Sequence, residues 1–203
     1  EIDRVNAWAM EHTREWYGEK TESQPHFASA LAAAWGGEPQ AEEELQKVVK
    51  DETLSAMARA SALAHLVPYQ NEESNAVAKA ALKDAEPLVR FAALSYFEEQ
   101  INALAAGIRE ADEEAIRADR EADETERALA GMELQNPQSK TFIQQRIGQI
   151  RQRATQARQQ AAQASEYLER VAEYPAPLLN DPMRLVRSEA GRVLAPVDGR
   201  LLN

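Results

Sequence analysis

Three histidines are the residues of this chain best suited to bind a metal ion or to transfer protons near neutral pH. They are His12, His26 and His65, and no second histidine lies within helical reach of any of them. A zinc or iron site would therefore need carboxylates from distant parts of the chain. We expect no metal site. His26, which precedes Phe27 in an aromatic segment, is the best candidate to contact a cofactor held by a neighbouring protein.

Carboxylate pairs at helical spacing, such as Glu110 and Glu114, could in principle perform acid–base chemistry. They fall on the expected surface of a long helix, where water solvates them and no cleft shifts a pKa. The chain has no cysteine, no glycine-rich phosphate loop, no nucleophile elbow and no Cys-His arrangement. We therefore predict a protein that is not an enzyme, with no catalytic residue and no cofactor of its own.

The composition of the 203 residues narrows the fold class and the partners. There are 38 alanines against 8 glycines and 9 prolines, and only 6% of the residues are aromatic, which favours an all-helical fold. The 23 basic and 34 acidic residues give a net charge of -11, which disfavours nucleic acid and anionic membranes as partners. No apolar run approaches the ~18 residues of a membrane span. We expect a protein partner or a second copy of this chain, and no membrane insertion.

Three stretches of the sequence resemble one another, which is typical of a repeat architecture. Each begins with an arginine, has an alanine three positions later and a large apolar residue seven positions later. An aspartate precedes each arginine and should accept amide hydrogens at the start of a helix. The arginines can then bridge the aspartates of stacked neighbours. The repeat signature consists of Asp51 and Arg59, Asp84 and Arg90, and Asp181 and Arg187.

This signature resembles the HEAT-like repeats first named from phycobilin lyases, in which antiparallel helix pairs stack into a right-handed solenoid. The second and third copies carry the family pattern Asp-x-x-x-x-Val-Arg. The first copy has Ala58 in place of the valine and two extra residues between the aspartate and the arginine. The resemblance covers about residues 41–97 and 175–197. It implies a core of neighbour contacts and exposed faces that bind partners.

A long insertion separates the second and third copies. Arg59 and Arg90 lie 31 residues apart, whereas Arg90 and Arg187 lie 97 apart, which leaves about 66 residues beyond one repeat period. Both halves of this insertion place apolar or small residues at alternating spacings of four and three, which indicates a left-handed coiled coil. Gly131 and Asn136-Pro137 mark a turn between the halves. We predict an antiparallel coiled-coil hairpin over residues 98–174.

The two halves match in an antiparallel register, because the numbers of every two facing residues add up to 272. The middle of the seam is nearly all alanine, which permits a close approach of the helices. Acidic residues crowd the first half and basic residues the second, and this favours the same orientation. The predicted seam consists of Ile101, Leu104, Ile108, Ala111, Ala115, Ala118, Ala122 and Leu129 on the first half, and Ile143, Ile147, Ile150, Ala154, Ala157, Ala161, Ala164, Leu168 and Val171 on the second.

The predicted fold class is thus all-α, a short HEAT-like solenoid with an inserted long antiparallel coiled-coil hairpin. Residues 1–37 form an N-terminal cap of two short helices that carries all three tryptophans, Trp35 being expected on an apolar face. Residues 38–97 and 175–203 form the HEAT-like repeats.

The N-terminal segment adds a second resemblance. Ala7-Trp8-Ala9 through Glu15-Trp16-Tyr17-Gly18, and then His26 through Leu31, are similar to the region after the last haem-attachment motif in bacterial multihaem c-type cytochromes with HEAT or tetratricopeptide tails. This resemblance implies a periplasmic location and a haem-free docking tail of an electron-transfer protein. The long hairpin is not part of that family's usual pattern.

Our leading functional hypothesis from the sequence is a non-catalytic interaction scaffold, the docking tail of a periplasmic multihaem cytochrome. A first alternative is self-association, in which two hairpins form a four-helix bundle that buries Ile116 and Leu134. A second alternative is a chromophore-lyase-like enzyme, because the repeat family includes such lyases. That alternative predicts bilin or haem binding, which an absorbance titration measures.

Overall fold

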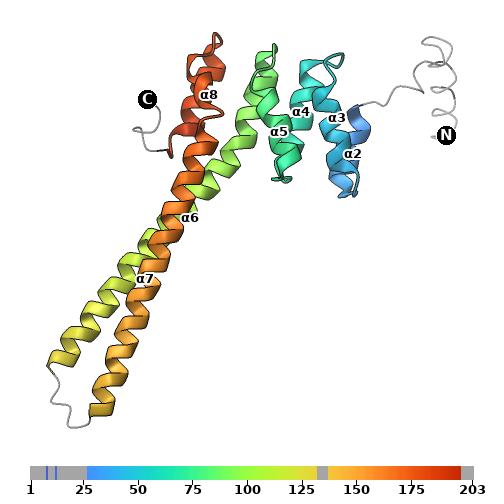
Figure 1. Ribbon diagram of the computed structural model, residues 1–203. Coiled ribbons are helices and arrows are strands. Elements are labelled where there is room, and N and C mark those ends of the chain that lie inside the picture. Colours follow the sequence, from blue (N-terminus) through green and yellow to red (C-terminus); the bar gives the residue numbers. More distant parts are fainter. Residues whose placement is uncertain (1–7, 9–11, 13–26, 132–136, 198–203) are drawn as a thin grey trace.

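A computed structural model describes Trp8, His12 and residues 27–131 and 137–197, and these residues contain helices and no strand. The prediction of an all-helical protein is therefore confirmed for the described part of the chain. The elements are α2 (Phe27–Gly36), α3 (Ala41–Lys50), α4 (Ala56–Leu66), α5 (Glu72–Ala81), α6 (Pro87–Ala130), α7 (Pro137–Ala172), the short 3-10 helix η2 (Ala176–Asn180) and α8 (Arg184–Leu194) (Figure 1). Most of the predicted N-terminal cap, with His26, and residues 132–136 and 198–203 lie outside the described residues.

The short helices begin where the sequence supplies capping groups. The Ser55 hydroxyl accepts a hydrogen bond from the Ala58 amide at the start of α4, and the Asn71 side chain accepts one from the Ser74 amide, 3.0 Å away, at the start of α5. Helix α6 begins with Pro87, whose ring favours the first helical position and has no amide hydrogen to satisfy. These local signals fix where α4, α5 and α6 begin.

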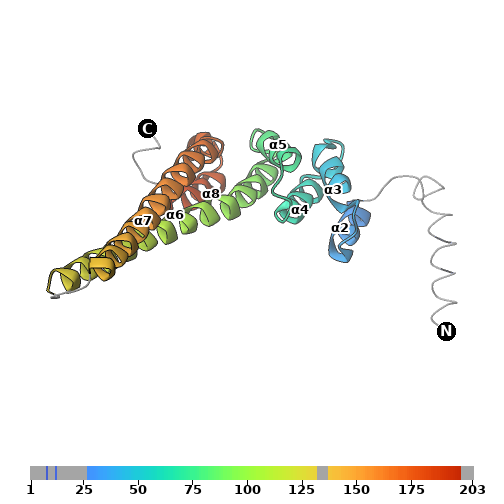
Figure 2. The ribbon, with the colours of Figure 1, turned by 60° about the horizontal axis from the view of Figure 1, so that its bottom comes forward.

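The helices stack in two rows. Helices α2, α4, the first part of α6, and α8 contact one another in that order, while α3 contacts α5 in the second row. Figures 1 and 2 show this succession of helices from α2 to α8, with the pair α6 and α7 extending far beyond it. Both rows bury their facing sides in one continuous hydrophobic core.

That core is shared between the short helices and the ends of the two long ones. Leu63 of α4, Leu94 of α6 and Val193 of α8 belong to it, and so do Leu168 and Val171 near the end of α7. Tyr96 is also fully buried, and its hydroxyl donates to the Tyr69 carbonyl oxygen at 2.9 Å. The end of α7 thus occupies the place of a second-row helix beside α6.

The two long helices are unbroken. Helix α6 has 44 residues, about 66 Å at 1.5 Å per residue, and the boundary expected between residues 97 and 98 falls inside it. Helix α7 has 36 residues and runs back beside it. We call residues 109–130 and 137–163 the arm, and the other described residues from 27 onward the body.

At the N-terminal end of the body, α2 differs from the sequence-based expectation that Trp35 lies on an apolar face. Trp35 is 73% exposed, and Ala33 on the opposite side of the helix is buried instead. Its indole still contacts the His65 ring edge to face, with 5.7 Å between the ring centres.

None of the helices in the described ranges combines the length and the apolar character that crossing a membrane requires.

Candidate functional site

The three signature aspartates each hold the turn that precedes a helix. The Asp84 carboxylate accepts the Glu86 amide at 2.9 Å, and the Asp181 carboxylate accepts the Met183 amide at 2.8 Å. Asp51 accepts the amide of Thr53 at 3.0 Å in the same way. The same two-residue turn therefore occurs at all three copies of the signature, because a short acidic side chain reaches the amide two positions ahead.

The arginine six residues after the aspartate binds back to the same turn. Arg90 Nη1 donates to the carbonyl oxygens of Asp84 and Ala85 at 2.7 and 2.9 Å. Arg187 Nη1 donates to the carbonyl oxygens of Asp181 and Pro182 at 2.6 and 3.0 Å. These bonds occupy carbonyl groups that the helix itself cannot reach.

In the first copy the two extra residues change this contact. Arg59 Nε donates to the carbonyl oxygen of Val49, at the end of α3, at a distance of 3.1 Å. The arginine therefore ties the turn to the preceding helix rather than to the carbonyl group of Asp51.

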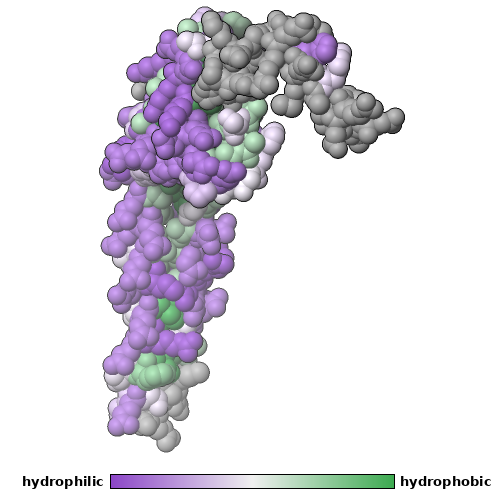
Figure 3. All heavy atoms as spheres, turned by 90° about the vertical axis from the view of Figure 1, so that its right-hand side faces the viewer, coloured by the Kyte–Doolittle hydropathy of each residue, from purple (hydrophilic) through white to green (hydrophobic). Residues whose placement is uncertain are grey.

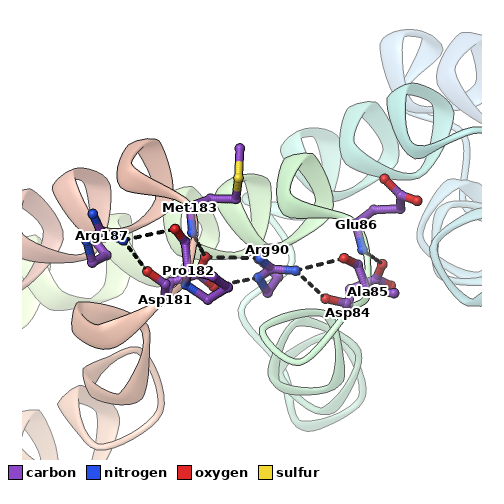
Figure 4. A network of polar contacts seen from close by, with 8 residues as sticks. All are labelled: Asp84, Ala85, Glu86, Arg90, Asp181, Pro182, Met183 and Arg187. Atoms are coloured by element: carbon purple, nitrogen blue, oxygen red, sulfur yellow. Dashed lines mark hydrogen bonds and ion pairs between the residues drawn. The ribbon is translucent and has the colours of Figure 1, made fainter.

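Each of the first two arginines also bridges to the aspartate of the following copy. Arg59 pairs with Asp84, and Arg90 binds Asp181 through two parallel bonds of 2.7 and 3.0 Å. Figure 4 shows the second half of this chain of contacts, which runs from Asp84 through Arg90 and Asp181 to Arg187. We call the whole series the arginine–aspartate ladder. It joins residues 91 positions apart in sequence.

The ladder is mostly buried, and its charges are paired. The side chains of Arg90 and Asp181 are only 10% and 3% exposed. The bond from Arg90 is the main reason that the pKa of Asp181 lies below its ordinary value. A buried carboxylate held ionised by a bidentate arginine is a poor proton carrier, so this arrangement positions helices.

The two ends of the ladder differ from its middle. Arg187 is exposed, and within the described part of the chain its guanidinium donates hydrogen bonds to backbone carbonyl groups and forms no salt bridge with a carboxylate. The Asp51 carboxylate is exposed as well and is held by the amide and hydroxyl of Thr53, which lower its pKa. The ends thus form weaker contacts than the buried middle.

A groove of about 860 Å³ lies between α3 and α5, beside the first rung of the ladder. Val49, Val77 and Ala80 contribute apolar surface, while Lys50 and Glu86 are among its charged residues. Charges of both signs surround it, so it has no clear preference for an anionic or a cationic ligand. The sequence analysis did not predict this groove, because it depends on how far apart the second-row helices stack.

The predicted seam lies between α6 and α7 along the whole arm and its base. None of its members is exposed. The buried ones are Ile101, Ala115, Ala118, Ala122, Ile147, Ile150, Ala154, Ala157, Ala161, Leu168 and Val171, and the half-buried ones are Leu104, Ile108, Ala111, Leu129, Ile143 and Ala164. Off this seam, Ile116 is 49% exposed on the outer side of α6.

The seam connects two different clusters. Residues at its base, such as Ile101 and Leu168, belong to the core of the body, whereas Ala118, Ala122, Ile147, Ile150 and Ala154 form a separate cluster farther out. Between the clusters the seam consists of alanines. The arm is therefore held to the body by large side chains at its base and closed by small ones in its middle.

Ion pairs cross the seam on both flanks. Arg158 and Arg151 of α7 pair with Asp119 and Glu126 of α6 on one flank. On the other, Arg153 reaches Glu121 at 2.8 Å and Glu114 at 2.9 Å. Except for Glu126, each of these side chains immediately precedes or follows a seam residue, which is where interhelical pairs form in coiled coils.

The histidines show no metal-binding arrangement in the described residues. No group of three or more His, Asp or Glu side chains in the described ranges could hold a metal ion. His12 Nδ1 lies 3.0 Å from the carbonyl oxygen of Trp8, and His65 lies against Trp35. His26, the candidate for a cofactor contact, lies outside the described residues.

Sequence reasoning missed one polar link between distant segments. Arg192 of α8 forms two bonds of 2.5 and 2.6 Å with the Glu98 carboxylate of α6, 94 positions away, and also binds Glu189. The bond from Arg192 lowers the pKa of Glu98. No local pattern identifies these partners, because only the stacking of α8 on α6 brings them together.

The chain matches no protein-family model, and no curated protein matches it in sequence.

Proposed function

We propose that this protein is a non-catalytic interaction scaffold, a short HEAT-like solenoid from which an antiparallel coiled-coil arm projects. The observation that carries the proposal is the continuity of α6 and α7, which run without a break from the core of the body into the arm. The arm residues span about 33 Å in α6 and about 40 Å in α7 at 1.5 Å per residue. A partner bound there is held at a fixed distance from the body.

The ladder supports the solenoid part of this proposal. Its buried rungs join α4 to α6 and α6 to α8, so the first-row helices keep a set spacing. Two positions of α8 are polar or small where the equivalent positions of the inner helices are apolar, whereas Leu185 of the same helix is apolar and 63% exposed. Gly191 corresponds to Leu63 and Leu94, and Ser188 to Ala60 and Phe91.

The resemblance of the N-terminal segment extends the proposal to a biological setting. On that basis the chain is the docking tail of a periplasmic multihaem c-type cytochrome in an electron-transfer pathway. The codons upstream of Glu1 test this extension. Several Cys-x-x-Cys-His motifs and an export signal would support it, and an upstream sequence without them would contradict it.

A distance measurement tests the rigidity on which the scaffold depends. The chain has no cysteine, so spin labels can be placed at Ala130→Cys near the tip and at Lys83→Cys in the body. Pulsed electron paramagnetic resonance, in an excess of unlabelled protein, should give one narrow distance distribution. The control pair Gln70→Cys and Lys83→Cys, both within the body, defines the width expected of a rigid reference. A much broader distribution for the tip would overturn the proposal.

A further inference from the structure

A small pocket opens at the base of the arm, where α5, α6 and the end of α7 meet. Its volume is about 120 Å³, and a protein cavity of about 150 Å³ holds benzene. It is lined by Lys79 of α5, Phe97 of α6, Tyr167 and Arg170 of α7, and Tyr174 just after α7. We call this space the base pocket. It has room for a molecule with a single ring, and it connects the body to the arm.

The inner surface of the base pocket is apolar and aromatic. Phe97 and Val171 are 1% and 3% exposed and belong to the core of the body. The Tyr174 ring lies against Phe97, with 5.9 Å between the ring centres. The Gln100 amide donates to the Tyr167 hydroxyl at 3.3 Å. Both tyrosines are thus held in place, yet they stay 40% and 37% exposed, so a ligand can reach their rings. The arm itself is different, because its side chains are mostly hydrophilic on the face that Figure 3 shows.

Two cations are the charged residues of the base pocket. Lys79 Nζ lies 3.8 Å from the centre of the Tyr174 ring, and the Arg170 guanidinium carbon lies 5.6 Å from the centre of the Tyr167 ring. Each cation therefore lies over one aromatic wall, where the face of the ring attracts it. None of the lining residues, all of which belong to the described ranges, is acidic. In a chain with a net charge of -11, such a pocket favours an anion over a cation.

The surroundings leave both cations available to a ligand. Lys79 is half-buried, and among the residues that the structure describes no carboxylate forms an ion pair with it. Arg170 lies 3.8 Å from the Glu166 carboxylate, but the Glu166 side chain is 73% exposed and does not line the pocket. An exposed pair of this kind contributes little to stability. An anion in the base pocket can therefore take the place of Glu166.

We propose that the base pocket binds a small aromatic carboxylate. The ring of such a ligand packs on Phe97 and beside the rings of Tyr167 and Tyr174, where offset and edge-to-face contacts are favourable. Its carboxylate accepts charge-assisted hydrogen bonds from Lys79 and Arg170. A ligand held in this way contacts α5 and α7 at once and links the body to the base of the arm. The site is independent of whatever binds the arm, and therefore adds to the proposed scaffold function.

Nuclear magnetic resonance titrations of the full chain test the proposal. Benzoate should cause saturable shifts in the amide signals of the base pocket, with a dissociation constant of about 10 mM or less. Benzamide has nearly the same shape but no charge, and it should bind at least about tenfold more weakly. Acetate keeps the charge but has no ring, so it should also bind at least about tenfold more weakly. Equal binding of benzoate and either of the other two compounds would contradict the proposal, and so would benzoate shifts that never saturate.

The variant Lys79→Gln/Arg170→Gln removes both cations of the base pocket. It should bind benzoate at least about tenfold more weakly than the wild type and benzamide equally well. The control variant Lys140→Gln/Arg146→Gln removes two exposed cations of the arm, outside the base pocket, and should bind benzoate like the wild type. A pocket variant that binds benzoate as tightly as this control would overturn the inference. The comparison of the three compounds on the wild type needs no variant, so it decides the question even if the pocket variant fails to fold.

Discussion

At the scale of single residues, the ladder offers a comparison between a buried and an exposed copy of the same contact. Arg90 is enclosed and holds the buried Asp181 carboxylate, whereas Arg187 occupies the equivalent position with exposed surroundings. Breaking a buried pair leaves an uncompensated charge, while an exposed arginine contributes little.

We therefore expect Arg90→Met to lower the free energy of unfolding by about 3 to 5 kcal/mol. The matched variant Arg187→Met should lower it by about 1 kcal/mol, because it loses only hydrogen bonds to carbonyl groups near solvent. Urea denaturation followed by circular dichroism measures both. Equal losses for the two variants would contradict the role given to burial.

The ion pair between Arg90 and Asp181 should make the stability of the protein depend on pH. Since Arg90 lowers the pKa of Asp181 in the folded protein, the unfolded chain takes up protons first as the pH falls below about 4. The stabilisation is therefore complete above about pH 5 and is lost as the pH falls through the folded pKa. Thermal melts should show the gap in melting temperature between the wild type and Asp181→Asn narrowing from pH 6 to pH 3. A constant gap would mean that Asp181 does not titrate differently in the two states.

Burial has the opposite consequence at Tyr96. It raises the pKa of the phenol to about 12, so the hydroxyl stays protonated and donates to the Tyr69 carbonyl oxygen. Tyr96→Phe leaves that partly buried carbonyl group without its donor and should cost about 1 kcal/mol. In the wild type the stability should also fall as the pH rises from about 10 towards 12, where the unfolded state loses its proton first. Chemical denaturation of both proteins at pH 8 and pH 11 measures the two effects.

At the scale of elements, the arm depends on small side chains. Ala118 of α6 is fully buried opposite Ala154 of α7, so the two backbones pack closely there. A larger side chain has no room without pushing the helices apart. The flanking ion pairs then lose their geometry as well.

Ala118→Leu should therefore destabilise the arm by about 1 to 3 kcal/mol. Ala103→Leu, at an exposed position of the same helix, is the matched control and should change stability by less than about 0.5 kcal/mol. Hydrogen exchange of the arm amides measures the effect where it occurs. Faster exchange in the control than in the seam variant would contradict the close packing of the seam.

At the scale of the whole molecule, the arm and the body share the helices α6 and α7, but the outer part of the arm has a hydrophobic cluster of its own. The base of the arm, with Ile101, Leu168 and Val171, belongs to the core of the body, whereas the outer cluster is separate. Deleting residues 112–160 and joining Ala111 to Ala161 by a short glycine-rich loop removes only the outer part.

That shortened protein should keep a cooperative melt within a few degrees of the wild type and sediment as a more compact particle. Deleting residues 98–174, the whole predicted insertion, should instead unfold the body. It removes three large core side chains that contribute about 2 to 5 kcal/mol each, against a total stability of about 5 to 15 kcal/mol. Calorimetry and sedimentation velocity measure both deletions. A stable protein after the longer deletion would show that the body does not need the base of the arm.

Features that depend on residues close together in the sequence were predicted, and features that depend on the stacking of helices were not. The signature Asp-x-x-x-x-Val-Arg identified Arg90 and Arg187 because an aspartate turn and the arginine that binds back to it are neighbours in sequence. The exposure of Trp35 and the groove beside Arg59 were not predicted. Both depend on how adjacent helices stack, which a helical period does not contain.

The sequence by itself determined that the chain is helical, where the helices start, and which side of each long helix is apolar, since these follow from spacings of three and four residues. Only the tertiary structure decided that Arg90 meets Asp181, that Arg192 meets Glu98, and that α6 passes from body to arm without a break. The physical reason is that a contact across more than 90 residues exists only after the intervening helices have folded back and stacked.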